Sequence, residues 1–174
     1  MTSRIALLTP VLMVGCAVIA ISFGIRSSFG IFQIPISQDF SWLRSEYSMA
    51  IAIQNLAWGL GQPIFGAIAD KFGDRRAIFG GALVYAAGLI LSSSAVTPAA
   101  HQVYSVLIGF GVAGTGFGVI LAVVGRSSSD ANRSMSLAIA TAAGSIGQIF
   151  GPPLAEYLLI IFSWQIVFVC FAIV

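Results

Sequence analysis

The sequence predicts an all-helical protein that crosses a membrane several times, and three observations support this. Of its 174 residues, 58% are apolar and only 8% are charged, whereas a soluble domain carries about 25% charged residues on average. The charged residues lie between long apolar segments, and a spanning helix needs about 20 apolar residues. The net charge of +2 includes no basic block that could hold nucleic-acid phosphates. We therefore expect a polytopic α-helical protein in a lipid bilayer, with room for about six spans and no nucleic-acid partner.

Five segments are long enough to span the bilayer, and a sixth is short. The expected spans are residues 8–34, 47–69, 77–96, 104–124, 136–161 and, in part, 165–174. Ten residues of helix rise about 15 Å, which is half the hydrocarbon thickness. We therefore expect one transmembrane domain over residues 1–174 with an incomplete sixth helix.

Basic residues set the expected orientation, because cytoplasmic loops carry more of them. If the spans alternate in direction, Arg44 is the only base on one side, and six bases fall on the other: Arg4, Lys71, Arg75, Arg76, Arg126 and Arg133. We therefore expect a cytoplasmic amino terminus, and we assign the protein to a bacterial inner membrane. Near the outer boundary we expect Trp42, Tyr157 and Trp164 as aromatic anchors and His101 at a span edge.

Two short patterns recur about three spans apart. Residues 23–31 are echoed by residues 110–119, and residues 61–66 by residues 147–151, at offsets of 85 to 88 residues. Because three is odd, the two copies have opposite orientations in the membrane, which is a feature of secondary transporters. Chance similarity between helices rich in Phe and Gly is the alternative.

The loop between the second and third spans has a distinctive spacing of glycine, acid and bases: Gly66, Asp70, Lys71, Gly73, Arg75 and Arg76. It resembles the cytoplasmic signature loop of the major facilitator superfamily. Gly66 would let the helix end approach another helix closely, and Asp70 would face the positive end of a neighbouring helix. The resemblance implies a latch between two halves of a transporter. A plain tight turn is the alternative, although it explains the bases better than Gly66, Asp70 and Gly73.

The fifth span supports the same resemblance. Gly147, Gly151 and Pro152 are similar to the glycine–proline signature of that helix in the superfamily, where small residues allow close packing. Residues 28–32, 39–46 and 132–138 resemble the monocarboxylate and oxalate/formate branch. The resemblance implies the N-terminal six-helix bundle of a twelve-helix fold, built as a 3+3 inverted repeat. In the fourth span, His101 stands where many members have an arginine.

Arg26 is the strongest candidate for binding, because it lies deep within the first span. An arginine at the centre of a spanning helix costs about 2.5–3.5 kcal/mol on insertion scales. We expect it to face an aqueous cavity and hold a carboxylate through paired hydrogen bonds, and the monocarboxylate branch has a base at a similar position. A structural arginine that pairs with a helix end or another span is the alternative.

The resemblance also suggests Gln33, Gln54 and Tyr104 as substrate-binding residues, although polar side chains commonly tie helices together.

These observations favour secondary active transport of a small organic anion, a mono- or dicarboxylate, by alternating access. The expected partners are the bilayer, the anion, and a missing C-terminal six-helix half or another membrane subunit. The alternative is a transport-inactive fragment or an accessory subunit of a larger membrane complex. We expect no enzyme, cofactor or metal site, since the sequence shows no Ser/His/Asp set, metal cluster or phosphate loop.

Overall fold

The computed structural model describes residues 9–174, so Arg4 and the first residue of the first expected span lie outside the described residues. This part of the chain is all-helical, which confirms the predicted fold class. Its helices are α1 (Pro10–Phe40), α2 (Arg44–Phe72), α3 (Asp74–Ser93), α4 (Pro98–Thr115), α5 (Phe117–Ser127), α6 (Arg133–Ile161) and α7 (Trp164–Ile173).

Four helical segments of the described chain are long and apolar enough to cross a membrane: Pro10–Phe40, Asp74–Ser93, Pro98–Ser127 and Arg133–Ile161. The 29-residue α2 is long enough but less apolar. Its hydrophobic residues are interrupted by Gln54, Asn55 and Gln62. The ten-residue α7 is short.

The helix boundaries differ most from the sequence prediction at the end of the first span and the start of the fourth, and the others lie within about three residues of it. The first helix does not end at residue 34 but continues through Pro35 to Phe40, where Ser41 takes a left-handed conformation. The fourth span begins earlier than predicted, at Pro98, because Thr97 caps it by accepting a hydrogen bond from the Ala100 amide. It is also broken into α4 and α5, since Gly116 is extended (φ −93°, ψ −168°) between them.

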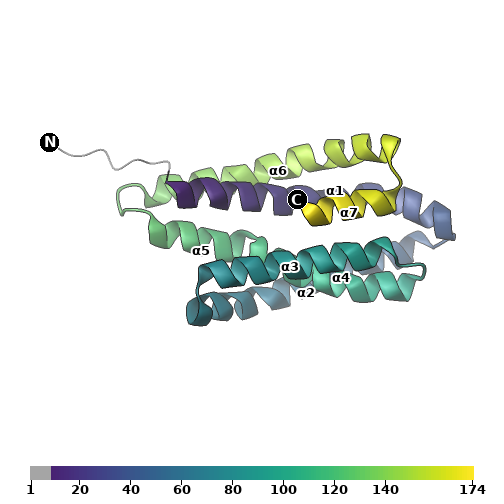
Figure 1. The fold of residues 1–174 in the computed structure, drawn as a ribbon, viewed down its shortest axis with the longest axis horizontal. Coiled ribbons are helices and arrows are strands. Elements are labelled where there is room, and N and C mark those ends of the chain that lie inside the picture. The colour runs from purple at the N-terminus through teal and green to yellow at the C-terminus, as the bar shows by residue number, and fades with distance from the viewer. Residues whose placement is uncertain (1–8) are drawn as a thin grey trace.

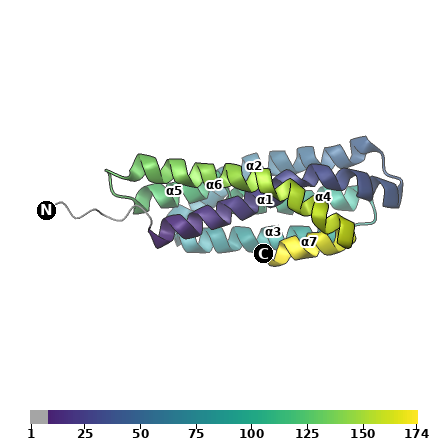
Figure 2. The ribbon, with the colours of Figure 1, turned by 90° about the horizontal axis from the view of Figure 1, so that it is seen from above.

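The helices form two groups (Figure 1). One group holds α1, α6 and α7, and the other holds α2, α3 and α4; Figure 2 shows the same bundle from above. The most extensive packing joins α1 to α6, α2 to α4 and α3 to α4. Helices of the first three expected spans therefore pack largely against helices of the last three.

Glycines set the closest of these approaches. A Cβ atom on Gly147 would lie 2.0 Å from the carbonyl oxygen of Ala20, so the backbones of α6 and α1 meet without a side chain between them. Between α3 and α4, a Cβ atom on Gly81 would lie 2.7 Å from the Cα of Gly114. Small residues thus allow tight helix contacts, as is common in membranes.

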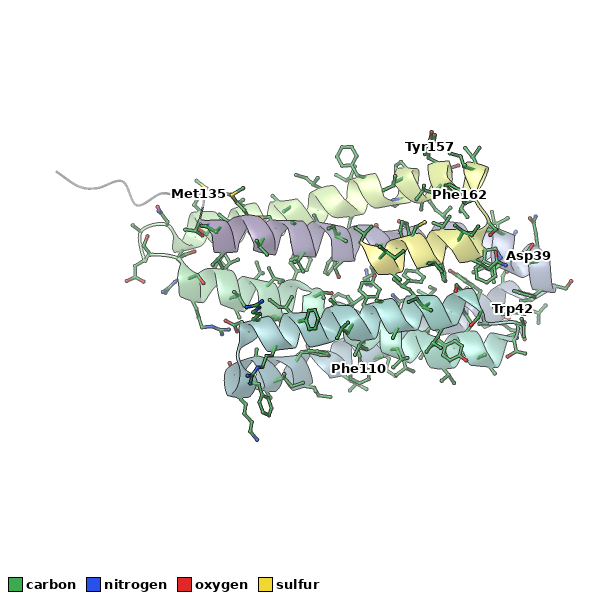
Figure 3. The ribbon with its side chains drawn as sticks, viewed as in Figure 1. Asp39, Trp42, Phe110, Met135, Tyr157 and Phe162 are labelled. Atoms are coloured by element: carbon green, nitrogen blue, oxygen red, sulfur yellow. The ribbon has the colours of Figure 1, made fainter. Side chains whose placement is uncertain are left out.

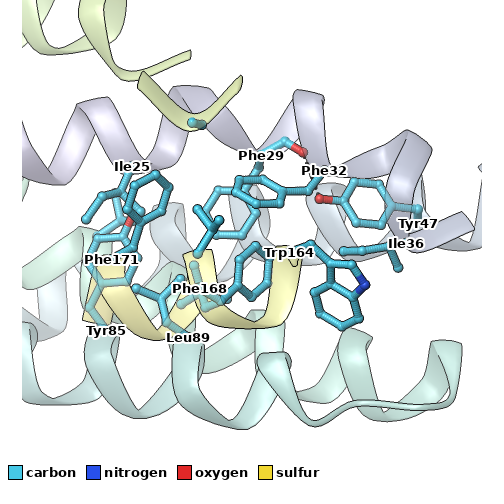
Figure 4. Close-up of a cluster of buried hydrophobic side chains, with 14 of the residues drawn as sticks. Ile25, Phe29, Phe32, Ile36, Tyr47, Tyr85, Leu89, Trp164, Phe168 and Phe171 are labelled. Atoms are coloured by element: carbon cyan, nitrogen blue, oxygen red, sulfur yellow. Dashed lines mark hydrogen bonds between the residues drawn. The ribbon is translucent and has the colours of Figure 1, made fainter. Parts of the chain in front are cut away.

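A cluster of buried aromatic and aliphatic side chains extends from the α1–α2 turn to Ile25 and Tyr85 in the middle of the bundle (Figure 4). It buries Trp42 and Trp164, which the sequence placed at the membrane boundary, because their rings fill the space where α1, α4 and α7 meet. His101 is also buried, with 1% exposure, and stacks on the Tyr47 ring at 5.5 Å. Tyr157 differs from these residues, since it is 61% exposed and points away from the bundle in Figure 3.

Candidate functional site

Arg26 lies near the middle of α1, about 24 Å along the helix from Pro10 at the usual rise of about 1.5 Å per residue. Its side chain is half-buried and reaches α2. Its Nη2 donates a hydrogen bond to the Asn55 side-chain oxygen, and its guanidinium carbon lies 4.5 Å from the centre of the Trp58 ring. The Phe23 ring lies on the α1 side, at 5.9 Å. The sequence left open that Arg26 pairs with another span. The structure shows part of that alternative, because Arg26 contacts the Asn55 amide and the Trp58 indole of α2.

The partners of Arg26 are neutral. The ion pairs of the described residues involve Arg126 and Arg133, and none joins Arg26 to a carboxylate. A half-buried cation within a membrane-spanning helix that has no counter-charge is unfavourable, and a carboxylate would compensate it. The arrangement therefore suits an anion.

The surface of α2 beside Arg26 carries small and polar residues. Five exposed positions recur every three or four residues and so lie on one side of the helix: Ser48, Ala52, Asn55, Gly59 and Gln62. On the other side of α1, the Ser27 hydroxyl donates a hydrogen bond to the Gln148 carbonyl of α6 at 3.2 Å. Thr141 and Ser145 are exposed on the same face of α6 as Gln148. Small and polar groups of α2 and α6 thus flank α1 around Arg26.

The other three candidate binding residues, Gln33, Gln54 and Tyr104, lie in three different environments. Gln33 donates hydrogen bonds to the Arg44 carbonyl and the Ser48 hydroxyl, both at 3.3 Å, and therefore joins the polar side of α2. Gln54 is only 3% exposed, and its backbone carbonyl oxygen would lie 2.3 Å from a Cβ atom on Gly109 of α4. Gln54 therefore lies in the α2–α4 interface. Tyr104 is half-buried on α4, and no described hydrogen bond joins it to Arg26.

Trp58 was not predicted from the sequence as part of the site, because a tryptophan within an apolar segment is most simply explained as core packing. The available signal was Asn55, a polar residue one helical turn earlier on the same face.

The signature loop is a turn of one residue, Gly73, between α2 and α3. Arg126 at the end of α5 donates a hydrogen bond to Asp74, and its Nη1 lies 4.0 Å from an Asp70 oxygen. From the sequence, Arg126 was expected only to set the orientation in the membrane, so this link was not predicted. A Cβ on Gly66 would meet no described atom within 4 Å, so its close helix contact stays a prediction.

The remaining residues of the loop signature lie at the α2–α3 turn, and those of the glycine–proline signature lie in α6. Lys71, Arg75 and Arg76 are exposed, with the Lys71 ammonium 5.3 Å from the Phe72 ring. In α6, Gly147 and Gly151 face α1, and the helix continues through Pro152.

Comparison with known proteins places this helical bundle in a family. The family model described as Major Facilitator Superfamily matches residues 14–174. The chain belongs to the major facilitator superfamily. It is an integral membrane protein, and its all-helical bundle fits the N-terminal half of the superfamily fold, as predicted.

Two curated relatives support the predicted branch of the superfamily. They are monocarboxylate transporter 13 of Bos taurus and of Rattus norvegicus. Each is 32% identical over 155 residues, which cover 84% of this chain and 34% of the relative. This superfamily chain thus spans about a third of the length of these curated relatives. Both relatives are mammalian, so they give no support to a bacterial membrane, which stays a prediction.

Proposed function

We propose that this protein carries out secondary active transport of a small mono- or dicarboxylate by alternating access. One observation carries the proposal: Arg26 is a half-buried cation in a membrane-spanning helix, and its side-chain partners are the neutral Asn55 and Trp58. A substrate carboxylate would supply the missing charge, and a guanidinium binds carboxylate through two parallel hydrogen bonds.

Two further observations support this substrate class. Both relatives carry the name monocarboxylate transporter. Gln33 of α1 donates a hydrogen bond to Ser48 of α2, on the side of α2 that also carries Asn55, so both residues offer hydrogen-bond donors along the route of the anion. Tyr104 is a candidate residue at the border of the transport pathway. Gln54 is a candidate for contact with the substrate only if the α2–α4 interface opens.

The proposal includes an orientation and a conformational latch. The amino terminus and the signature loop lie on the cytoplasmic side, in a bacterial inner membrane. Asp70, Lys71, Arg75 and Arg76 contact a second six-helix half, or another membrane subunit, when the inner side is closed. Gly66 and Gly73 allow the chain to turn and approach that partner closely.

Uptake into proteoliposomes tests the function. The complete protein is reconstituted and supplied with radiolabelled pyruvate as a monocarboxylate and oxalate as a dicarboxylate. We expect uptake of at least one by the parent protein and none above background by Arg26→Gln, at equal amounts of reconstituted protein. Arg44→Gln is the matched control, because it removes one exposed arginine at the start of α2 and should transport like the parent.

Two results would contradict the proposal. Uptake by Arg26→Gln equal to that of the parent would remove Arg26 from the binding site. A parent protein that takes up no carboxylate would favour the alternative of an accessory subunit without transport activity.

A further inference from the structure

Trp58 occupies a junction between helices. Its ring meets the Phe23 ring of α1 edge-on, with the ring centres 5.8 Å apart. Its indole nitrogen would lie 3.7 Å from a Cβ on Gly116, at the break between α4 and α5. It also packs against each of the three buried hydrophobic clusters of the described chain. Trp58 is therefore fixed by packing on several sides. A residue that positions another side chain must itself be fixed in this way.

The guanidinium of Arg26 rests on this support. Its carbon lies 4.5 Å from the Trp58 ring centre, within the range of about 6 Å in which a cation is attracted to an aromatic face. Asn55 is one turn before Trp58 and accepts a hydrogen bond from Nη2 of Arg26. The Asn55 amide nitrogen donates to the Ile51 carbonyl at 2.9 Å, which points its oxygen toward Arg26. An edge and a face of the guanidinium are thus fixed by two uncharged groups.

We propose that Asn55 and Trp58 are positioning residues that hold Arg26 ready for the substrate carboxylate. This inference rests on the proposed role of Arg26 in binding the anion. A free arginine side chain would lose conformational entropy when the anion binds, and a preformed guanidinium has already lost it. Because both partners are neutral, they fix the guanidinium without satisfying its charge. The site therefore keeps its attraction for an anion.

Variants of Trp58 separate positioning from packing. Trp58→Leu removes the aromatic face and should raise the KM for carboxylate uptake about 2- to 13-fold, the range expected when one long side chain must be ordered on binding, with the maximal rate retained. Trp58→Phe keeps an aromatic face and should restore most of the affinity. Phe117→Leu is the control, because Phe117 packs on Phe23 with ring centres 4.3 Å apart and has no contact with Arg26 in the described structure. Equal KM values for Trp58→Leu and Trp58→Phe would overturn the role of Trp58.

Asn55→Asp gives a sharper test. A carboxylate oxygen can accept the same hydrogen bond from Arg26, so the fold and the thermal midpoint should be retained. Its charge, however, would satisfy Arg26 and compete with the substrate. We expect the KM to rise at least about tenfold, whereas a residue 55 that does not contact the guanidinium of Arg26 in the transporting protein would tolerate the change. Uptake by Asn55→Asp with the KM of the parent would overturn the role of Asn55.

A measurement without substrate distinguishes this inference from the proposed function. The complete protein is labelled with p-hydroxyphenylglyoxal, which modifies arginine, and the Arg26 peptide is quantified by mass spectrometry. Labelling of Arg26 should be several times faster in Trp58→Leu than in the parent or Phe117→Leu. An unchanged labelling rate would overturn the positioning role even if carboxylate is transported. A parent that transports no carboxylate but shows the faster labelling in Trp58→Leu would overturn the proposed function and, with it, positioning for an anion, while leaving the contact itself established.

Discussion

A Cβ atom on Gly151 of α6 would lie 2.1 Å from the carbonyl oxygen of Gly24 on α1. The two helices therefore cross with backbone against backbone. One turn further along α1, the Ser27 hydroxyl bonds to the Gln148 carbonyl of α6. The crossing thus sets the distance between the helix that carries Arg26 and the polar face of α6.

Gly151→Ala should destabilise the protein, because the added methyl group meets backbone atoms that cannot rotate away. Overpacking of this kind costs about 1–3 kcal/mol. Gly30→Ala on α1 is the control, since its methyl group would meet no described atom within 4 Å and alanine favours helix by about 0.5–1 kcal/mol over glycine. Thermal unfolding in detergent measures both variants. Matching midpoints for the two would contradict the close crossing.

Gly73→Ala should strain the turn between α2 and α3. Gly73 has φ 94° and ψ 149°, a region in which side chains are rarely tolerated. The cost of such a conformation is about 1–3 kcal/mol. Gly80→Ala, inside α3 and open to its surroundings, should be at least as stable as the parent. A Gly73→Ala protein that unfolds at the same temperature as Gly80→Ala would argue against the strained turn.

The sequence predicted most of the helices because a lipid-facing helix needs a long apolar segment, and such segments are visible without knowledge of packing. Helix starts are also encoded locally, but the Thr97–Pro98 pair that caps α4 was not recognised, so the fourth span was predicted to begin six residues too late, at residue 104. The signature loop was recognised because its glycines and charges have a fixed spacing.

The site depended on packing that the sequence does not show. Gln54 and Asn55 are adjacent polar residues, yet a rotation of about 100° around α2 buries one and exposes the other beside Arg26. The break at Gly116 was equally hidden, because several neighbouring glycines remain helical. Only the contacts between helices decide these positions.

Trp164→Phe should weaken the link between α7 and the end of α1. The indole nitrogen of Trp164 donates a hydrogen bond to the Asp39 carboxylate at 2.6 Å, and hydrogen bonds to charged groups contribute about 1.5–3 kcal/mol. Phenylalanine keeps an aromatic ring against Phe168 but lacks the donor. A double-mutant cycle with Asp39→Ala, which has no side-chain acceptor, isolates the bond. If the two single changes simply add, the predicted interaction does not stabilise the fold.

Arg126→Gln should change conformational cycling more than stability. Arg126 joins the end of α5 to the signature loop through Asp74 and, at 4.0 Å, Asp70. The Asp70 side chain is 78% exposed, and exposed pairs contribute about 0–1 kcal/mol, so the thermal midpoint should move little. If the pairs orient the loop for the latch, Arg126→Gln and Asp70→Asn should lower the maximal uptake rate severalfold and leave the KM unchanged. Uptake kinetics in proteoliposomes measure both quantities. The exchanged pair Arg126→Asp with Asp74→Arg should recover part of the rate, whereas an equal loss of rate and affinity in the single variants would contradict a latch.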